Sequence, residues 1–468
     1  MSNLQTYFRN AGIVARPNAN DGLWLMFLLP AAVITSAFNH PIVLTPTYKL
    51  VSVSCLGLIC SSIVFIHSCL RGQKLGKTVI WDLPIILTVT AIFHLYIKTA
   101  LIVSILSTLT CTLIYRRALI FMLKKFPQSF TIGEASLITQ ALVILLYATG
   151  LNLFYFVGKM YTSNMQISTL IIQVGLLGIG TIAGCCYLMK PRSPVAFYTM
   201  ASLIVCGVIF LPLHVLLNRS PLLWIIQTMF YDMSSIKLVL YWSFCSGTAV
   251  LAISNQIYYA KKASTSQRKV FHLLAVSVFV PGLLFKCSFL YLSSGVVLGI
   301  FFALELIRIL KMPPLDKFLE NGFAVFVDEK DVGVVAFTPL YLLAGCSLPM
   351  WLHPAPCDVT DSAMFCLLPL LSGLLTIGVG DTAASVVGSN YGKHKWKDSP
   401  KSIEGTVACV LSQALFVIIL VYFGWLKSLT VVQHVKIAVA IVATSIIEAK
   451  TTQVDNLVLP LVMYTILI

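Results

Sequence analysis

Long apolar segments recur along nearly the whole chain, and only short polar stretches separate them. A helix that crosses the hydrocarbon core of a bilayer needs ~20 mostly apolar residues. About fifteen segments approach that length and composition, at residues 23–39, 50–70, 78–97, 98–115, 136–157, 166–189, 195–217, 239–260, 270–285, 287–310, 333–352, 363–387, 403–425, 433–448 and 457–468. The sequence therefore predicts an all-α fold, a polytopic membrane helix bundle with about 13–15 transmembrane segments.

The composition supports the same fold class. Of the 468 residues, 58% are hydrophobic and 10% are charged, whereas soluble proteins carry about 25% charged residues. Little sequence remains for a soluble domain. The thirteen cysteines are scattered, and most lie in the expected spans, where a free cysteine behaves as a small hydrophobe. We therefore expect neither a disulfide framework nor a zinc site.

Basic residues gather in polar stretches that are separated from one another by even numbers of apolar segments. These stretches are 71–77, 116–125, 190–192, 261–269, 308–317 and 393–401. The loops between them contain few basic residues. Because lysine and arginine are enriched in the cytoplasmic loops of membrane proteins, all of these stretches are expected in the cytoplasm. Much of the net charge of +15 would then face anionic lipid headgroups.

Acidic residues are few and unevenly distributed. Thirteen of the seventeen follow residue 300, and most of these lie in or beside the regions 305–331, 381–404 and 448–455. Glu134 is an exception, because Thr-Ile-Gly-Glu at 131–134 has the spacing of a capping box at a helix start. Acids within or at the edge of a membrane are costly and are functional candidates by default. The chemistry is therefore expected in the C-terminal part of the chain, on the cytoplasmic face.

The segment GVGDTAASVVGSNYGKHKWKDSPKSIEGT, at 378–406, combines an acid, glycines, lysines and a helix start. Asp381 stands at the end of an apolar segment beside small residues, which leave room for a cation or a phosphate. Carboxylates and phosphate oxygens together hold Mg²⁺, and glycines and helix N-termini bind phosphates. The segment therefore predicts a site for a polyphosphate with a divalent metal. Its candidate nucleotide-binding residues are Gly388, Ser389, Gly392, Lys393, Lys395, Lys397, Lys401, Ser402, Gly405 and Thr406.

Known soluble nucleotide-binding motifs do not account for this segment. A P-loop has four residues between its glycines and a Ser or Thr after the lysine. Here three residues separate Gly388 from Gly392, and His394 follows the lysine. The H-R-D and D-F-G motifs of protein kinases are absent. A nucleotide would have to be held by membrane helices in another arrangement.

Three further segments place polar residues at the ends of spans. RKVFHLL at 268–274 is explained equally well by a positive-inside anchor, and FVDEKDVG at 326–333 by a solvated loop. EAKTTQVDNLVLP at 448–460 interrupts what could have been a continuous span, which favours a functional role. The further candidate residues in these segments are Arg268, Lys269, His272, Asp328, Glu329, Asp331, Glu448, Asp455 and Asn456.

The motifs GVGDTAASVVGSNYG, KSIEGT and EAKTTQVDNLVLP resemble the polyprenol kinase family. The similarity extends to RKVFHLL, to FVDEKDVGVVAFTPLYLLAGCSLPMWL and more weakly to PLLWIIQTMF and YWSF, and within the family it is closest to the dolichol kinases. The close similarity covers residues 266–468, whereas the N-terminal half matches mainly in its pattern of spans. We therefore divide the chain into an N-terminal transmembrane region, 1–265, and a C-terminal catalytic membrane region, 266–468.

The resemblance implies CTP-dependent phosphorylation of the terminal hydroxyl of dolichol. The products would be dolichyl phosphate, the lipid carrier for protein glycosylation, and CDP. The resemblance also implies a multi-pass protein of the endoplasmic reticulum membrane with its catalytic face in the cytoplasm. Dolichol and CTP are the expected partners, and neither a nucleic acid nor an obligate protein partner is indicated. The expected cofactor is a divalent metal, Mg²⁺ with Ca²⁺ as the alternative.

Phosphoryl transfer depends on positioning and on charge neutralisation more than on covalent help from the protein. We assign Asp381 to the metal, with Asp455 as a second ligand. Lys401 and Lys393 are expected to contact phosphates. The acid that orients or deprotonates the alcohol remains open between two residues, Glu404 and Asp328.

Two other functions remain open from the sequence. A cytidylyltransferase that makes a CDP-lipid would use the same metal-binding and phosphate-binding groups, and phosphatidate cytidylyltransferases share parts of the C-terminal pattern. A membrane transporter would also have many spans and intramembrane acids. Against a transporter, the acids lie at one face of the membrane and the sequence shows no internal repeat.

Overall fold

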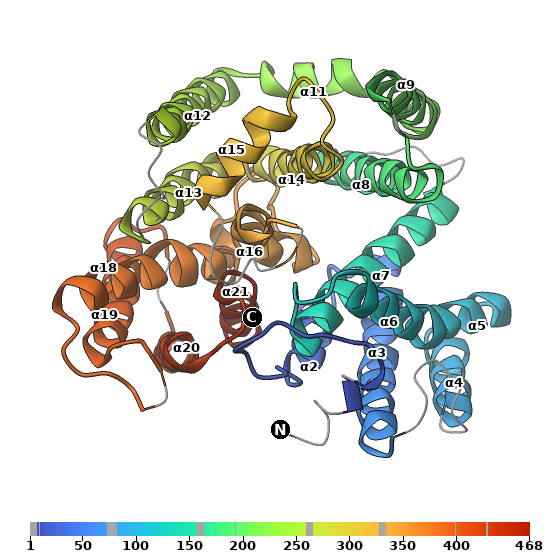
Figure 1. Ribbon diagram of the computed structural model, residues 1–468, viewed down its shortest axis with the longest axis horizontal. Helices are drawn as coiled ribbons and strands as arrows, with labels where there is room; N and C mark the ends of the chain where they lie inside the picture. The colour runs from blue at the N-terminus through green and yellow to red at the C-terminus, as the bar shows by residue number, and fades with distance from the viewer. Residues whose placement is uncertain are drawn as a thin grey trace.

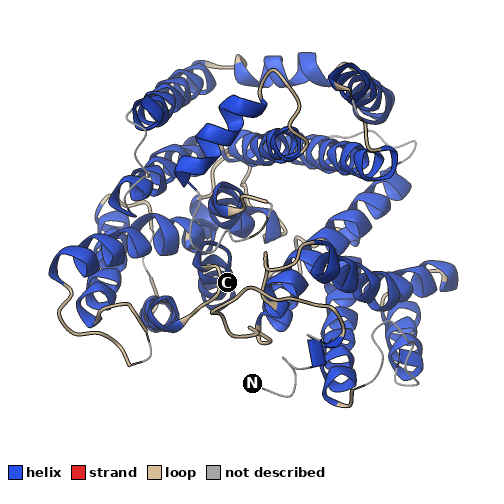
Figure 2. Cartoon of the chain, in the orientation of Figure 1, coloured by secondary structure: helices blue, strands red, loops and turns tan. Residues whose placement is uncertain are grey.

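A computed structural model describes residues 7–8, 10–72, 82–156, 163–191, 193–258, 265–326, 333, 335–397, 399–426 and 429–468. Within these residues the regular elements are helices and none is a strand (Figure 2). One isolated bridge between Lys395 and Ser402 is the only β-type pairing in the described part. The expected all-α fold is confirmed.

Each of the expected apolar segments coincides with one helix or with consecutive helices. The helices are α2 (Leu25–Asn39), α3 (Pro46–Leu70), α4 (Asp82–Ala91), α5 (Leu101–Leu109), α6 (Tyr115–Lys125), α7 (Ile132–Phe156), α8 (Asn164–Met189), α9 (Pro194–Ile204), α10 (Leu211–Leu217), α11 (Pro221–Met229), α12 (Met233–Tyr258), α13 (Thr265–Phe285), α14 (Cys287–Ile309), α15 (Asp316–Phe326), α16 (Thr338–Leu352), α17 (Leu367–Leu370), α18 (Thr382–Tyr391), α19 (Ile403–Tyr422), α20 (Val431–Lys450) and α21 (Asp455–Leu467). Between some of them lie π-helical turns, η1 (Ile92–Tyr96), η2 (Thr110–Ile114), η3 (Val205–Phe210) and η5 (Leu374–Asp381), and one 3₁₀ turn, η4 (Met364–Cys366).

The length of the helices fits a multi-pass membrane protein. Among the described residues, nine helices are long and apolar enough to cross a bilayer, or up to ten if the bent pair Met364–Leu370 and Leu374–Tyr391 is one span. Four shorter apolar helices accompany them, at Leu25–Asn39, Asp82–Leu95, Lys269–Phe285 and Asp455–Leu467. The expected count of 13–15 segments includes these shorter helices, which a strict length criterion leaves out.

Several helices start at the side chains that the sequence offers as caps. At α7, the Thr131 N–H donates to Glu134 Oε2 at 2.9 Å, and the Glu134 N–H donates to Thr131 Oγ1 at 3.2 Å. This reciprocal pair is the expected capping box. Thr430 and Gln433 form a second capping box at α20, and Ser402 caps α19 by accepting from the Gly405 N–H. Local sequence therefore fixes where these helices begin.

Helices α2 and α21, which are far apart in the sequence (Figure 1), share one core. α2 packs against α3, α7 and α21, and Leu25, Leu29, Val458 and Leu461 are buried together. Ser36 of α2 lies 2.9 Å from the Tyr464 hydroxyl of α21. The N-terminal helix α2 therefore supports α21, which begins at Asp455.

A second core holds η5 in place. It contains buried residues of α13, α14, α16, η5, α19 and α20. At Gly373, directly before η5, an added Cβ would lie 2.3 Å from the Gly345 carbonyl oxygen of α16. The backbones of the two elements therefore touch, and this contact fixes the position of the turn that ends at Asp381.

The structure corrects the expectation that no disulfide is present. Cys287, at the start of α14, and Cys357, in the loop after α16, are joined by a disulfide. They lie 70 residues apart in the sequence. The pattern of cysteines could not indicate the pair, because only the packing of α14 beside α16 brings the two ends together.

Candidate active site

Asp381 is a buried carboxylate whose partners come from α13. The Lys269 ammonium donates to Asp381 Oδ2, and His272 Nδ1 lies 3.5 Å from the same oxygen. The Asp381 side chain is only 5% exposed. Among the described residues, His272 Nδ1 has no hydrogen-bond partner within normal geometry. A buried charge requires a partner of opposite sign, and α13 supplies it from more than a hundred residues away in the sequence.

Lys401 occupies the centre of a second charged group. Its Nζ donates to the Glu448 carbonyl oxygen at 2.7 Å and to the Glu448 carboxylate, and it lies 3.9 Å from Asp455 Oδ2. Burial alone would lower the pKa of Lys401, but the charges of Asp455, Glu448 and Asp381 outweigh burial and raise that pKa. Lys401 therefore remains an ammonium at neutral pH.

The two groups form one cluster. Asp381 interacts electrostatically with Asp455 and Lys401 as well as with its α13 neighbours. The cluster combines ends of α13, η5, α20 and α21 with the loop before α19. Three of its members, Asp381, Lys401 and Asp455, were central to the sequence-based prediction. The structure brings them together with Lys269, His272 and Glu448.

The lysine-rich loop at 392–402 folds back on itself beside this cluster. The Trp396 N–H donates to the Lys401 carbonyl at 3.0 Å, and the Ile403 N–H donates to the His394 carbonyl at 2.8 Å. Trp396 Nε1 donates to Thr406 Oγ1 at 2.9 Å. These bonds hold the loop against the start of α19.

The same loop is also attached to α20. Ser399 Oγ donates to the Ala449 carbonyl at 2.7 Å, and Lys450 Nζ lies 5.3 Å from the centre of the Trp396 ring. Of the four lysines in the loop, Lys401 is partly buried, whereas Lys393, Lys395 and Lys397 are exposed. Only Lys401 contacts the acids of the cluster, so the lysines are not equivalent.

The glycines of this segment allow α18 and α19 to pack closely. Gly388 lies inside α18 and not in a loop. An added Cβ at Gly405 would lie 2.9 Å from the Ala384 carbonyl oxygen and 3.3 Å from Gly388 Cα. The Gly392 N–H donates to the Gly388 carbonyl at 3.2 Å. Contact with a phosphate therefore remains a prediction for these three glycines, while helix packing is their observed role.

The first amide groups of α19 already have partners within the protein. Besides the bond from Ile403, the Gly405 N–H donates to Ser402 Oγ at 3.1 Å, and the Thr406 N–H donates to the Ser402 carbonyl at 3.2 Å. A phosphate at this helix start would have to displace these contacts. Ser389 lies apart, where its hydroxyl donates to the Val386 carbonyl at 3.2 Å.

Glu404 lies beside the loop and outside the cluster. Its carboxylate accepts from the His394 backbone N–H at 3.1 and 3.2 Å and lies 2.7 Å from His394 Nδ1. Its side chain is 28% exposed. Glu404 therefore anchors the loop in this structure, and a role toward the alcohol remains a prediction.

The remaining candidates are placed as follows. Asn456 is buried in the first turn of α21, and its N–H donates to Asp455 Oδ1 at 3.2 Å. Arg268 belongs to α13 by its backbone, but its side chain lies outside the described residues. Three acids, Asp328, Glu329 and Asp331, lie outside the described residues altogether.

The sequence-based prediction missed the support that the N-terminal region gives to the site. Arg16 Nη2 donates to Glu134 Oε1 at 2.7 Å and to the Thr452 carbonyl at 2.9 Å. Glu134 Oε1 also accepts from the Val454 N–H at 2.7 Å. This buried network braces the loop between Glu448 and Asp455. The capping-box spacing indicated Glu134, but its second partner depends on α2, which packs against both α7 and α21.

A polar contact also extends from Gln453 to the N-terminal segment. Gln453 Oε1 accepts from Thr131 Oγ1 at 2.6 Å, and Gln453 Nε2 donates to the Asn20 carbonyl at 2.9 Å. Gln453 is fully buried. The loop that leads to Asp455 is therefore held by hydrogen bonds both from the start of α7 and from the segment before α2.

Comparison with known proteins places the chain among lipid kinases. The model of one protein family, described as dolichol kinase, matches residues 63–341. Dolichol kinase of Mus musculus is 32% identical over 383 residues, 78% of this chain and 70% of the relative. Dolichol kinase of Homo sapiens is 32% identical over 382 residues, 78% and 69% of the two chains. Dolichol kinase EVAN of Arabidopsis thaliana is 34% identical over 256 residues, 53% and 43%. No solved structure matches.

The matched residues 63–341 extend well into the N-terminal region. The resemblance in individual motifs was strongest after residue 266, whereas the family match begins near the end of α3. The helices from α4 to α12 are therefore part of what this chain shares with that family.

Proposed function

Because the chain belongs to the dolichol kinase family, we propose that it transfers the γ-phosphoryl group of CTP to the terminal hydroxyl of dolichol. The hydroxyl oxygen forms a bond to the γ-phosphorus, the bond from the γ-phosphorus to the β–γ bridging oxygen breaks, and CDP leaves. The proton of the alcohol passes to a base or to water. The observation that carries this proposal is the cluster of Asp381, Lys269, Lys401, Glu448 and Asp455 at the ends of membrane helices.

The position of the cluster suits the two substrates. A polyisoprenoid alcohol stays in the bilayer, whereas a nucleoside triphosphate stays in water. The reaction therefore has to occur where membrane helices end, and the cluster is built from such ends. Phosphoryl transfer is accelerated mainly by positioning and by neutralising charge, and the two partly buried lysines, Lys269 and Lys401, supply positive charge at fixed positions.

The carboxylates of the cluster fit a hard divalent cation, because Mg²⁺ is usually bound by one or two carboxylates together with phosphate oxygens. We assign Asp381 and Asp455 as its ligands, with Ca²⁺ as the alternative metal. When bound, the ion would neutralise charge on the transferred phosphoryl group. Lys269 and Lys401, which now neutralise the same acids, would be free to contact the phosphates.

Other residues are proposed to attract CTP and to orient the alcohol. Lys393, Lys395 and Lys397 are exposed and would attract CTP through diffuse charge. His272 Nδ1 points to the oxygen of Asp381 without a normal hydrogen bond and could accept one from an incoming alcohol. Either Glu404 or Asp328 would orient or deprotonate that alcohol.

We place the cluster on the cytoplasmic face of the endoplasmic reticulum membrane, where dolichyl phosphate would serve protein glycosylation. The basic stretches support this orientation. The disulfide at Cys287 also supports it, since disulfides persist in oxidising compartments and Cys357 lies in a loop expected on the luminal side. Cysteine-accessibility labelling in sealed vesicles should find Lys395→Cys accessible from the cytosol and Val359→Cys, which is fully exposed, accessible from the lumen. The reverse pattern would contradict the orientation.

Purified protein with separately labelled CTP tests the reaction. Label from the γ-phosphate should enter dolichol, and label from the α-phosphate should remain in CDP. Transfer of the α-label would indicate a cytidylyltransferase. Transfer of neither label would favour a transporter. A parallel assay with γ-labelled ATP tests the nucleotide, because the charges of the cluster suit any triphosphate and do not distinguish cytosine from adenine.

A further inference from the structure

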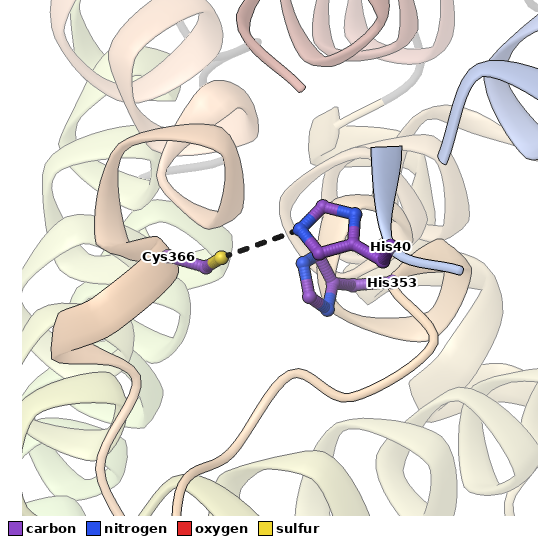
Figure 3. A group of neighbouring side chains, drawn as sticks. All are labelled: His40, His353 and Cys366. Atoms are coloured by element: carbon purple, nitrogen blue, oxygen red, sulfur yellow. Dashed lines mark hydrogen bonds between the residues drawn. The ribbon is translucent and has the colours of Figure 1, made fainter. Parts of the chain in front are cut away.

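Three residues that no step of the proposed reaction uses lie together at the far end of α2 (Figure 3). His40 follows the last residue of α2, His353 follows α16, and Cys366 ends η4. One donor atom from each side chain lies within 4.8 Å of the other two. In the part of the chain that the structure describes, this is the only such group of three histidine, cysteine or acidic side chains.

The ring of His40 is oriented as a metal ligand. Its Nδ1 lies 3.2 Å from the Ser36 carbonyl oxygen. Because a carbonyl only accepts, Nδ1 carries the proton and Nε2 presents a lone pair. Nε2 lies 3.7 Å from Cys366 Sγ (dashed line in Figure 3). Metal-ligating histidines commonly donate their other ring N–H to a backbone carbonyl in this way.

His353 supplies an independent observation. The residue is 4% exposed, and its Nε2 has no hydrogen-bond partner among the described residues. A buried polar atom without a partner destabilises a fold, so an atom of this kind beside two other donors points to a missing ligand. The ring of His353 lies edge-on to that of His40, with 4.6 Å between their centres.

Binding at Nε2 has a consequence for the other nitrogen of His353. At present the Ala355 N–H donates to Nδ1 at 3.1 Å, which leaves the proton of the neutral ring on Nε2. A metal at Nε2 would require the other tautomer of the neutral ring, in which the proton has moved from Nε2 to Nδ1, and the Ala355 N–H would then turn away. The peptide concerned lies in the irregular loop after α16, where such a rotation disturbs no helix.

From these observations we infer that His40, His353 and Cys366 form a three-ligand site for a Zn²⁺ ion. Tetrahedral zinc with Zn–N of about 2.1 Å and Zn–S of about 2.3 Å requires ~3.6 Å between nitrogen and sulfur, and the His40–Cys366 distance is 3.7 Å. A thiolate with two imidazoles selects zinc over Mg²⁺ and Ca²⁺, which prefer oxygen ligands. A water molecule would complete the four ligands of the ion.

The site lies away from the proposed active site. Asn20, which contacts Gln453, precedes the start of α2 at Leu25, and His40 directly follows its end, so the 15 residues of α2 separate the loop before Asp455 from His40 by roughly 22 Å at 1.5 Å per residue. At the far end, Asn39 Nδ2 donates to the Ile468 carbonyl at 2.8 Å. The ion would therefore join α2, α16 and η4 to one another and would not act on the phosphates. The expectation of no zinc site rested on the absence of closely spaced cysteines, and these ligands come from three distant segments.

The first experiment measures metal in the full-length protein. We expect about one Zn²⁺ per chain in wild-type protein purified in detergent without chelator. Cys366→Ala and His40→Ala should each lose most of this zinc. Cys60→Ala, another partly exposed free cysteine, and His434→Ala on α20 should retain it. Zinc that persists in both Cys366→Ala and His40→Ala would overturn the assignment.

The second experiment needs no variant and therefore does not depend on the variants' folding. Co²⁺ added to chelator-treated wild-type protein should produce a thiolate-to-cobalt charge-transfer band and the visible bands of tetrahedral cobalt. Zn²⁺ should abolish both, and excess Mg²⁺ should not. Zn²⁺ should also slow alkylation of Cys366 but not of Cys60, as measured by mass spectrometry. If neither band appears and alkylation is unchanged, the three residues form a hydrogen-bonded cluster only.

Discussion

At the scale of single residues, the charged cluster pairs each candidate acid with a basic side chain. Asp381 contacts Lys269, and Glu448 contacts Lys401. The sequence indicated these acids because few others exist and because membrane acids are costly. It could not indicate the pairs, since partners such as Lys269 and Asp381 lie on helices whose contact depends on the whole bundle. The sequence did not indicate the three proposed zinc ligands either, because they lie on distant segments that only the packing of the bundle brings together.

Asp381→Asn should abolish phosphoryl transfer while the protein remains inserted and folded. An amide keeps the shape of the side chain but does not neutralise a cation, and it also leaves the Lys269 ammonium unpaired. The measurement is γ-label transfer over a range of Mg²⁺ concentrations, with thermal unfolding in detergent as the folding control. Asp358→Asn, an acid in the loop after α16, should retain activity. Near-normal turnover of Asp381→Asn at saturating Mg²⁺ would contradict the assignment.

The lysines of the 392–402 loop should differ in their effect on CTP use. A charge-assisted contact to phosphate is worth about 1.5–3 kcal/mol, so Lys401→Ala should lower kcat/KM roughly ten- to a hundredfold. Lys395→Ala and Lys397→Ala remove exposed charges and should cost a few-fold, an effect that shrinks as salt rises because diffuse charge is screened over about 8 Å.

The measurement is kcat/KM for CTP of the three alanine variants at low and at high ionic strength. Lys401→Ala also leaves Glu448 buried without its ammonium, so Lys401→Arg is measured beside it to separate a lost charge from a lost fold. Equal losses for all three alanine variants would mean that the loop only attracts the nucleotide and that CTP is bound elsewhere.

At the scale of helices, the apolar periodicity and the caps predicted most of what is observed. The expected segments, the capping box at Glu134 and the helix start at Ser402 are all present. The π-helical turn η5 and the bend of 56° before it were not predicted, because they follow from close backbone contact at Gly373. The expected apolar segment ended at residue 387, yet α18 continues through Gly388 to Tyr391, because the small residues there pack on α19.

Gly405→Ala should disturb the site by separating α18 from α19. Its Cβ would lie 2.9 Å from a backbone oxygen of α18, and a backbone cannot move aside as a side chain can. We expect a lower melting temperature and a fall in kcat/KM of tenfold or more, on the order of the 1–3 kcal/mol that overpacking costs. Gly150→Ala in α7 has open space around its Cβ and should be neutral or slightly stabilising. If both variants behave alike, close packing at Gly405 is not what positions the loop.

At the scale of the whole molecule, the N-terminal region holds the loop between Glu448 and Asp455, two acids of the charged cluster. Arg16, Glu134 and the Val454 N–H form one buried network, and α2 shares its core with α21. The sequence separated an N-terminal membrane region from a catalytic one because motifs are dense only in the latter. Packing joins the two regions, and periodicity carries no information about which helices become neighbours.

Glu134→Gln should therefore impair catalysis from a position outside the charged cluster. The variant removes one charge of a buried pair and leaves Arg16 uncompensated, a change that costs about 3–5 kcal/mol when no relaxation occurs. The loop before Asp455, whose Thr452 carbonyl accepts from Arg16 and whose Val454 N–H donates to Glu134, should therefore open more often. We expect faster hydrogen exchange of the amides at 451–457 and a lower kcat/KM for CTP, with the Mg²⁺ dependence unchanged.

Asp82→Asn is the matched control, because Asp82 and Arg116 form a buried bidentate pair at 2.6 and 2.7 Å on α4 and α6, away from this loop. Both variants should lower the melting temperature, but only Glu134→Gln should accelerate exchange at 451–457. If Asp82→Asn accelerates it equally, the loop responds to global stability, and the N-terminal region has no specific hold on the site.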